Sequence, residues 1–465
     1  MNIAFILNGE SIELRDIEPT MTVLDWLRET RGLSGTKEGC NEGDCGACTV
    51  MVSDAGGTQA LNACVMFLPQ LNGKTLTTVE GLSGPGGALH PVQAAMIEHH
   101  ASQCGFCTPG IAVSLAAGQI AREADHTRQL AGNLCRCTGY APILRAAEAA
   151  ASEPVPDWLA GLGPAPIAAL EPELPTTPEA LASYLTRFPQ ARIVGGGTDV
   201  GLWVNKDMAD LGRVVFTTQI EEMRRIETAP YMLRIGGAAS VEQLRRAMVH
   251  LHPSFAEMLA RFASPQIRAA ATVGGNIANG SPIGDTPPPL IALDAVLLLR
   301  RGDQMRELPL EDFFIDYGKQ DLHPGEFVEA ITIPREPGTP DRLKVYKLSK
   351  RVDQDISAVL GAFDIHVADG KVTRARIVYG GMAGTPKRAQ AMEATLTGRR
   401  WTRESVEAAM GRVSEDFTPL SDARASMAYR LATAANMLMR YWLEDPLGAG
   451  GDTGIGPVTL AEVTP

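Results

Sequence analysis

All eight cysteines of this 465-residue chain fall into two sets whose spacing suits iron–sulfur chemistry. The first set is Cys40, Cys45, Cys48 and Cys64, and the second set is Cys104, Cys107, Cys135 and Cys137. A [2Fe–2S] cluster binds four thiolates, and the C-x4-C-x2-C…C order of the first set is the plant-type ferredoxin spacing. Two such clusters in one chain predict a protein that carries electrons.

Disulfides and zinc are the two alternatives for these cysteines. Disulfides need an oxidising compartment, and residues 1–5 lack the basic and apolar regions of an export signal. Zinc sites favour paired C-x2-C motifs, often with histidine, so the first set suits zinc poorly. The second set, two close pairs, is compatible with zinc when taken alone. Beside the first set, we interpret both as iron–sulfur ligands.

The elements around the first set predict a ferredoxin-like domain over residues 1–78. A strand at 3–7 runs into a hairpin turn at Asn8 and Gly9, and a short helix over 22–31 precedes the cysteine loop. A further strand leaves that loop at 48–52. Glycines inside the loop permit positive φ and a close approach of the backbone to a cluster.

Residues 79–152 change to a helical period around the second set. Helices are predicted to begin near Pro91, Thr108 and Ala141. The second and third of these helices begin close to the cysteine pairs. Unpaired amides and the positive end of a helix dipole suit a negatively charged cluster there.

The remainder of the chain divides by composition. Residues 153–178 are rich in proline and predict a semi-rigid linker. Residues 179–338 form an α/β segment, and residues 339–444 an α+β segment that closes on a long helix over 427–442. Residues 445–465 are a tail rich in glycine and proline, without periodicity.

Two glycine runs suggest a phosphate-binding site in the α/β segment. Gly195–Gly197 follow a strand at 192–194, and we expect a second glycine turn at Gly274 and Gly275. Consecutive amides at such turns can hold a pyrophosphate, although simple tight turns explain the glycines equally well. The Rossmann fingerprint fails, because the sixth position from Gly195 is Val200. A flavin would convert one-electron to two-electron chemistry here.

Charge and hydropathy exclude other classes of protein. The formal net charge of −12 argues against a nucleic-acid partner, and no apolar run reaches the length of a membrane helix. We therefore expect a soluble, cytoplasmic protein.

The order of these motifs, together with the segment Thr272-Val273-Gly274-Gly275-Asn276-Ile277-Ala278, resembles the molybdenum hydroxylase family over nearly the whole chain. In particular, it resembles the iron–sulfur and FAD subunits of bacterial xanthine dehydrogenases. The resemblance implies a multidomain α+β fold with four parts. These are a β-grasp [2Fe–2S] domain, a helical [2Fe–2S] domain built as a four-helix bundle, a FAD domain of the vanillyl-alcohol-oxidase type, and a C-terminal domain of the carbon monoxide dehydrogenase flavoprotein type.

The resemblance also assigns cofactor contacts by position. The FAD contacts that it implies are Ile193, Val194, Gly195, Gly196, Gly197, Thr198, Asp199, Val200, Phe262, Thr272, Val273, Gly274, Gly275, Asn276, Asp285, Val328 and Lys347. Phe262 would stack on the isoalloxazine, and Tyr317 would lie near the face where NAD docks. The second cysteine set would lie nearest the partner's molybdenum, with Gln103 toward that cofactor, and the first set would pass electrons to FAD.

The function implied by the resemblance is electron transfer within xanthine dehydrogenase. A large partner subunit would bind molybdopterin and oxidise hypoxanthine to xanthine and urate, with NAD as the final acceptor. The chain has no room for a molybdopterin domain, so it would carry no residue for the hydroxylation itself. Two copies of each chain would make a heterotetramer. Two alternatives are a partner acting on an aldehyde or another N-heterocycle, and a zinc-stabilised scaffold without a redox role.

Overall fold

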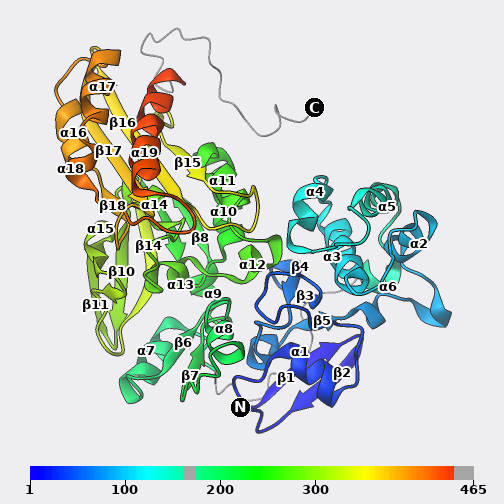
Figure 1. Ribbon diagram of the computed structural model, residues 1–465. Helices are drawn as coiled ribbons and strands as arrows, with labels where there is room; N and C mark the ends of the chain where they lie inside the picture. The colour runs from blue at the N-terminus through cyan, green and yellow to red at the C-terminus, as the bar shows by residue number, and fades with distance from the viewer. Residues whose placement is uncertain (161–173, 445–465) are drawn as a thin grey trace. The chain divides into compact units, whose positions relative to one another are not determined.

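The computed structural model describes residues 1–160 and 174–444, in two compact units (Figure 1). The first unit comprises residues 1–224, 240–242 and 263–272, and the second comprises residues 225–239, 243–262 and those from 273 onward. The predicted segment 179–338 thus contributes to both units. The predicted linker lies partly, and the predicted tail wholly, outside the described residues, and the division into domains stays a prediction.

A five-stranded sheet with the strand order β2-β1-β5-β3-β4 forms the start of the first unit. Its strands are β1 (Ile3–Leu7), β2 (Glu10–Leu14), β3 (Thr49–Asp54), β4 (Gly57–Asn62) and β5 (Thr75–Thr77). The β1 and β5 strands are parallel, and the other pairs are antiparallel. The hairpin predicted at Asn8 and Gly9 is confirmed, since both residues have positive φ and Leu7 pairs with Glu10.

The helix predicted over 22–31 is present as a short α-helix continued by a π-helical turn. These elements are α1 (Val23–Asp25) and η1 (Trp26–Thr30). Thr22 caps the helix by accepting a hydrogen bond from the Asp25 amide at 3.0 Å. Trp26 packs edge-on against Phe5, with ring centroids 5.4 Å apart, inside the core of the sheet. The β-grasp arrangement therefore brings the cysteine loop out between this helix and β3.

The helical part of the first unit surrounds a buried central helix. Its helices are α2 (Pro91–Glu98), α3 (Thr108–Ala121), α4 (His126–Gln129), α5 (Ala141–Ala151) and α6 (Asp157–Ala160). The predicted starts at Pro91, Thr108 and Ala141 are confirmed. The α3 helix is buried from Gly110 to Gly118 because it contacts β3 and β4 as well as the neighbouring helices. Apolar side chains all around it make this possible.

Short 3-10 turns and a small parallel sheet complete the first unit. The 3-10 turns are η2 (Leu68–Leu71), η3 (Val79–Gly81), η4 (Pro85–Gly87) and η5 (Leu130–Gly132). The remaining elements are α7 (Pro178–Arg187), β6 (Arg192–Val194), α8 (Val200–Asn205), β7 (Val214–Phe216), α9 (Glu221–Arg224) and α12 (Pro265–Ala270). The β6 and β7 strands pair in parallel and share a core with Phe67.

An antiparallel sheet with the order β11-β10-β14-β9-β8 organises the second unit. Its strands are β8 (Ile226–Ala229), β9 (Met232–Gly236), β10 (Val296–Arg301), β11 (Gln304–Pro309) and β14 (Phe327–Pro334), and a hairpin joins β12 (Phe314–Asp316) to β13 (Lys319–Gln320). The helices between residues 241 and 313 that accompany it are α10 (Val241–Leu251), α11 (Pro253–Ala260), α13 (Val273–Ala278), α14 (Pro287–Ala292) and α15 (Leu310–Phe313).

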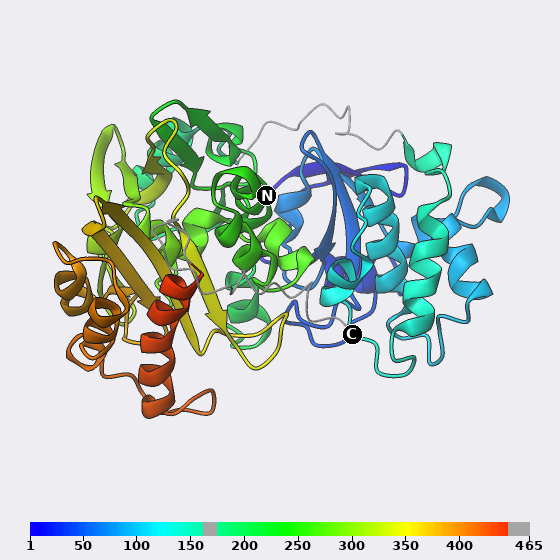
Figure 2. The same cartoon turned by 90° about the horizontal axis from the view of Figure 1, so that it is seen from above.

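A second antiparallel sheet ends the described chain. Its strands follow in the order β15 (Lys344–Leu348), β16 (Val359–Ala368), β17 (Lys371–Gly380) and β18 (Lys387–Arg388). The helices after them are α16 (Gln390–Leu396), α17 (Arg403–Met410), α18 (Val413–Asp416) and α19 (Met427–Leu443). Side chains of α16, α17 and α19 share one core with β16 and β17, and Figure 2 shows α19 (red) beside these strands. The long helix predicted over residues 427–442 is confirmed.

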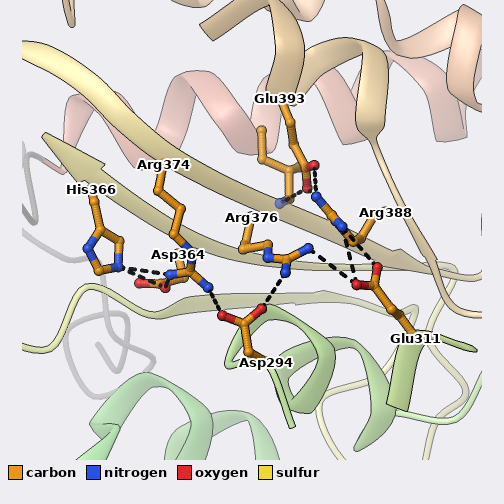
Figure 3. Close-up of polar contacts among 9 residues, drawn as sticks. Asp294, Glu311, Asp364, His366, Arg374, Arg376, Arg388 and Glu393 are labelled. Atoms are coloured by element: carbon orange, nitrogen blue, oxygen red, sulfur yellow. Dashed lines mark hydrogen bonds and ion pairs between the residues drawn. The ribbon is translucent and has the colours of Figure 1, made fainter. Parts of the chain in front are cut away.

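A chain of alternating carboxylates and guanidinium groups joins this sheet to the preceding segment of the second unit (Figure 3). Asp294 contacts both Arg374 and Arg376, with Oδ1 2.5 Å from Arg376 Nη2. Glu311 pairs with Arg388 at 3.0 Å, and Arg388 pairs with Glu393 at 2.6 Å. Because Asp294 and Glu311 each pair with two arginines of this sheet, the network fixes β17 and β18 against the residues that flank β10 and β11.

The described residues thus form a multidomain α+β structure. Among residues 1–160 and 174–444, no helix combines the length and the apolar character needed to cross a bilayer.

Candidate functional site

The structure brings the first cysteine set together in two pairs. The Cys48 and Cys64 sulfurs lie 3.3 Å apart, and both residues are buried. The Cys40 amide donates to Cys45 Sγ at 3.4 Å, and the Cys45 amide donates to Cys40 Sγ at 3.3 Å. A side chain at Gly39 would place its Cβ 2.7 Å from Cys45 Sγ, so any residue other than glycine there would have to displace that sulfur.

The contact between Cys40 and Cys45 separates the acidities of the two thiols. The hydrogen bond between their side chains lowers the pKa of Cys40 to about 5 and raises the pKa of Cys45. The Cys48–Cys64 contact acts in the same way, lowering the pKa of Cys48 and raising that of Cys64. In each pair the pKa of one thiol is therefore lowered, which favours the thiolate, the form that binds a metal.

The second cysteine set is also paired, next to the start of α3. Cys107 is the N-cap residue of α3, and the Cys104 and Cys137 sulfurs lie 3.4 Å apart. Burial first, and then a hydrogen bond with Cys135, raises the pKa of Cys107 to about 12. Cys104 and Cys137 are exposed, in contrast to the buried pair of the first set.

Pairs of thiols suit a two-iron cluster, because four thiolates then serve two metal ions. In residues 1–160 and 174–444, no three His, Cys, Asp or Glu side chains converge as ligands of a single metal ion. The donor set, the close approach at Gly39 and the backbone amides that donate to sulfur all fit [2Fe–2S] clusters. The ligand assignment itself stays a prediction.

The two cysteine loops are joined directly by hydrogen bonds. The Leu134 amide, one residue before Cys135, donates to the Cys45 carbonyl at 2.9 Å. Asn133 Nδ2 donates to the Gly46 carbonyl at 3.1 Å, and Gln266 Nε2 donates to Asn133 Oδ1 at 3.0 Å. Asn133 and Gln266 are almost fully buried. Sequence reasoning missed both residues, since a lone buried amide leaves no spacing pattern.

The first glycine run forms the predicted turn and packs tightly within the first unit. A Cβ at Gly195 would lie 2.5 Å from Thr272 Oγ1, and one at Gly196 would lie 1.9 Å from the Ala270 carbonyl oxygen. The predicted residues 193–200 and Thr272 are therefore adjacent. Burial raises the pKa of the Asp199 carboxyl at the end of this turn. The absence of side chains lets the backbone of this turn pack directly against Ala270 and Thr272, and phosphate binding by its amides stays a prediction.

The second glycine pair is not the turn that the sequence predicted. Gly274 and Gly275 lie inside α13, and a Cβ at Gly274 would lie 2.6 Å from the Gly237 carbonyl oxygen. The glycine therefore lets a helix approach another backbone segment closely. A Cβ at Gly237 would in turn lie 2.2 Å from the Val328 carbonyl oxygen, so Val328 belongs to the same contact. Asn276 accepts a hydrogen bond from Thr286 at 2.5 Å.

Asp285 and Lys347, two predicted FAD contacts, form a buried ion pair. Lys347 Nζ lies 2.6 Å from Asp285 Oδ2, and Ser357 Oγ donates to Asp285 Oδ1 at 2.6 Å. Arg261 Nη1 donates to the Lys347 carbonyl at 3.0 Å, and Lys347 Nζ donates to the Arg261 carbonyl at 3.4 Å, so the residue that precedes Phe262 contacts this pair. Ser357 and Arg261 were not predicted, because neither stands in a recognisable motif. Tyr317, in contrast, is 73% exposed beside Gly384.

Family models match most of the chain in four successive segments. Residues 5–68 match a 2Fe-2S iron-sulfur cluster binding domain, and residues 78–148 match a [2Fe-2S] binding domain. Residues 170–336 match the FAD binding domain in molybdopterin dehydrogenase, and residues 344–445 match the CO dehydrogenase flavoprotein C-terminal domain. The chain therefore carries two 2Fe–2S-binding domains and one FAD-binding domain.

Similar proteins are xanthine dehydrogenases and carbon monoxide dehydrogenases. The chain is 30% identical to xanthine dehydrogenase of Emericella nidulans, over 95% of this chain and 38% of that protein. It is 28% identical to xanthine dehydrogenase/oxidase of Gallus gallus, over 100% of this chain and 41% of that protein. The chain thus spans about two fifths of these relatives. A carbon monoxide dehydrogenase structure from Hydrogenophaga pseudoflava has a TM-score of 0.54 and 27% identity, covering 58% of this chain and 96% of that one.

Proposed function

We propose a function from the premise that this chain belongs to the molybdenum hydroxylase family. It is the electron-transfer half of an NAD-dependent xanthine dehydrogenase, and a separate molybdopterin-binding chain oxidises hypoxanthine to xanthine and then to urate. Two copies of each chain form the complex. When bound, the clusters and FAD supply one-electron transfer and its conversion to hydride transfer. This chain's own residues hold and space those groups.

The observation that carries the proposal is the direct link between the two cysteine loops. The hydrogen bond from the Leu134 amide to the Cys45 carbonyl connects a residue bonded to Cys135 with a member of the first set. Asn133, held by Gln266, adds a second bond to the same loop. Because Asn133 and Gln266 are buried and hydrogen-bonded to each other, this link fixes the separation of the two cysteine loops, which electron transfer requires.

Exposure supports the proposed order of the two sets. Cys104 and Cys137 are exposed, and the neighbouring Phe106 and Leu134 are 48% and 60% exposed. An apolar surface around an exposed cysteine pair suits contact with a partner chain. The first set is more buried and lies against the segment that follows the glycine turn. We therefore place the second set toward the molybdenum subunit and the first set toward FAD.

The test is the visible spectrum of the chain purified anaerobically with its co-expressed partner. Addition of xanthine should bleach both the flavin and the iron–sulfur bands, and NAD should then restore them with formation of NADH. If neither xanthine nor hypoxanthine bleaches these bands, the proposed substrate is refuted. If the bands bleach but do not recover when NAD is added, the proposed electron acceptor is refuted.

A second candidate keeps the electron-transfer role and changes the substrate of the partner. The chain is 27% identical to a carbon monoxide dehydrogenase structure and 30% identical to a xanthine dehydrogenase. Because these two identities are close, the similarity to carbon monoxide dehydrogenase supports this second candidate as well. The same spectral experiment with an aldehyde, nicotinate and carbon monoxide separates the two candidates. Bleaching by one of these, and not by xanthine, would select the second.

A further inference from the structure

Helix α8 connects the glycine turn to the first cysteine set. It begins at Val200, directly after the turn, and its last residue and C-cap residue are Asn205 and Lys206. Asn205 Nδ2 donates to the Cys64 carbonyl at 2.7 Å, and Lys206 Nζ donates to the Cys40 carbonyl at 2.5 Å. Two members of the first set therefore receive hydrogen bonds from a segment far along the chain.

The path of this segment is fixed by close packing on the residue after Cys64. A Cβ at Gly201 would lie 3.0 Å from both Cα and Cβ of Val65, and one at Gly197 would lie 2.6 Å from the Val65 carbonyl oxygen. Gly197 also has a φ of +77°, which a side chain would strain. The segment consequently cannot move away from Cys64 and Val65 without losing this packing, so the positions of Asn205 and Lys206 are set.

Lys206 brings a positive charge to the cysteine loop. Its ammonium group is also 3.4 Å from Glu42 Oε2, and both side chains are about two fifths exposed. Reduction of an iron–sulfur cluster adds a negative charge, and nearby cations and hydrogen bonds stabilise that charge. The Glu42 carboxylate opposes this effect, so the two residues act on the reduced state in opposite directions.

We propose that Lys206 is a positioning residue that raises the reduction potential of the cluster held by Cys40, Cys45, Cys48 and Cys64. Asn205 assists by fixing the Cys64 carbonyl. The flavin-proximal segment thereby adjusts the electron affinity of the cluster that passes electrons to it. This inference rests on the proposed function, because it takes these four cysteines as ligands.

The experiment is a redox titration of the full chain with its clusters, followed by electron paramagnetic resonance. At the potential where this cluster is half-reduced in the wild type, Lys206→Met should lower its reduced-to-oxidised ratio roughly threefold to tenfold. A tenfold change corresponds to about 59 mV for one electron. The signal of the second cluster serves as an internal reference and should not shift.

Three further variants make the result specific. Lys206→Arg keeps the charge and should retain most of the wild-type potential, and Glu42→Gln should raise the potential. Lys371→Met removes an exposed charge from β17 in the second unit and should shift neither cluster.

The outcomes separate this inference from the proposed function. If Lys206→Met and Glu42→Gln both leave the potential unchanged while Cys45→Ser still abolishes that signal, the role of Lys206 is overturned and the cluster assignment stands. If Cys45→Ser leaves both signals intact, the cluster assignment, and the proposed function with it, falls.

Discussion

The Lys347 ammonium lies 2.6 Å from the Asp285 carboxylate, with 1% and 6% of the two side chains exposed. The pair joins β15 to the residue that precedes Thr286 and α14, and Ser357 binds the second oxygen of the same carboxylate. Asp285 and Lys347 can therefore serve either to bind FAD or to stabilise the second unit. The two roles predict different effects of substitution on the stability of flavin-free protein.

Lys347→Met leaves the Asp285 charge buried without its counter-ion. Removal of one partner of such a pair costs about 3–5 kcal/mol of stability, whereas removal of both costs less. Chemical denaturation of flavin-free protein should therefore show a large loss for Lys347→Met and a partial recovery for Lys347→Met with Asp285→Asn. Equal stabilities of the single variant and the wild type would show that the pair acts on flavin binding alone.

Cys45→Ser should remove one [2Fe–2S] signal from the electron paramagnetic resonance spectrum and leave the other in place. The reason is that serine is a poor replacement for a thiolate ligand at iron, while the second set is untouched. Cys104→Ser is the matched control and should remove the opposite signal. Loss of both signals from either variant would contradict two independent clusters.

Gly196→Ala should weaken FAD binding. The added Cβ would lie 1.9 Å from the Ala270 carbonyl oxygen, so the turn must shift, at a cost of about 1–3 kcal/mol, or roughly fivefold to 150-fold in affinity. The flavin content of purified protein and a titration of flavin-free protein with FAD measure the effect. Gly411→Ala, whose Cβ would meet nothing closer than 3.4 Å, is the control and should keep full FAD content. Unchanged affinity in Gly196→Ala would mean that the turn is only a tight turn.

His90 should make the helical part of the first unit sensitive to acid. It is fully buried, its Nδ1 accepts the Val92 amide at 3.2 Å, and burial lowers its pKa to about 4. Between about pH 6.5 and 4 the unfolded chain binds a proton that folded His90 does not. Stability therefore falls as the pH falls through this window, by up to about 3 kcal/mol.

His90→Asn keeps a capping side chain at the start of α2 and removes the titration. The difference in unfolding temperature between this variant and the wild type should move in favour of the variant as the pH drops from 6.5 to 4.5. A difference that is independent of pH would refute the role of His90.

Local sequence was sufficient for the elements that carry the cysteines. The hairpin at Asn8 and Gly9 and the helix starts at Thr108 and Ala141 follow from residues adjacent in sequence, whose φ preferences and capping act within a few positions. The helix at Gly274 and Gly275 was wrongly predicted as a turn. Close packing on Gly237, a residue remote in sequence, favours glycine there as strongly as a turn does.

The sequence by itself determined the two cysteine sets, the order of the domains and the family, because ligand spacing and chain order are local properties. Only the tertiary structure decided which cysteines pair, that Leu134 bonds to Cys45, that Lys206 reaches Cys40, and that Asp285 and Lys347 neutralise each other. Apart from the neighbouring Cys40 and Cys45, these contacts join residues separated by between 16 and 166 positions. Their formation depends on how whole elements pack, which residue types and spacing do not encode.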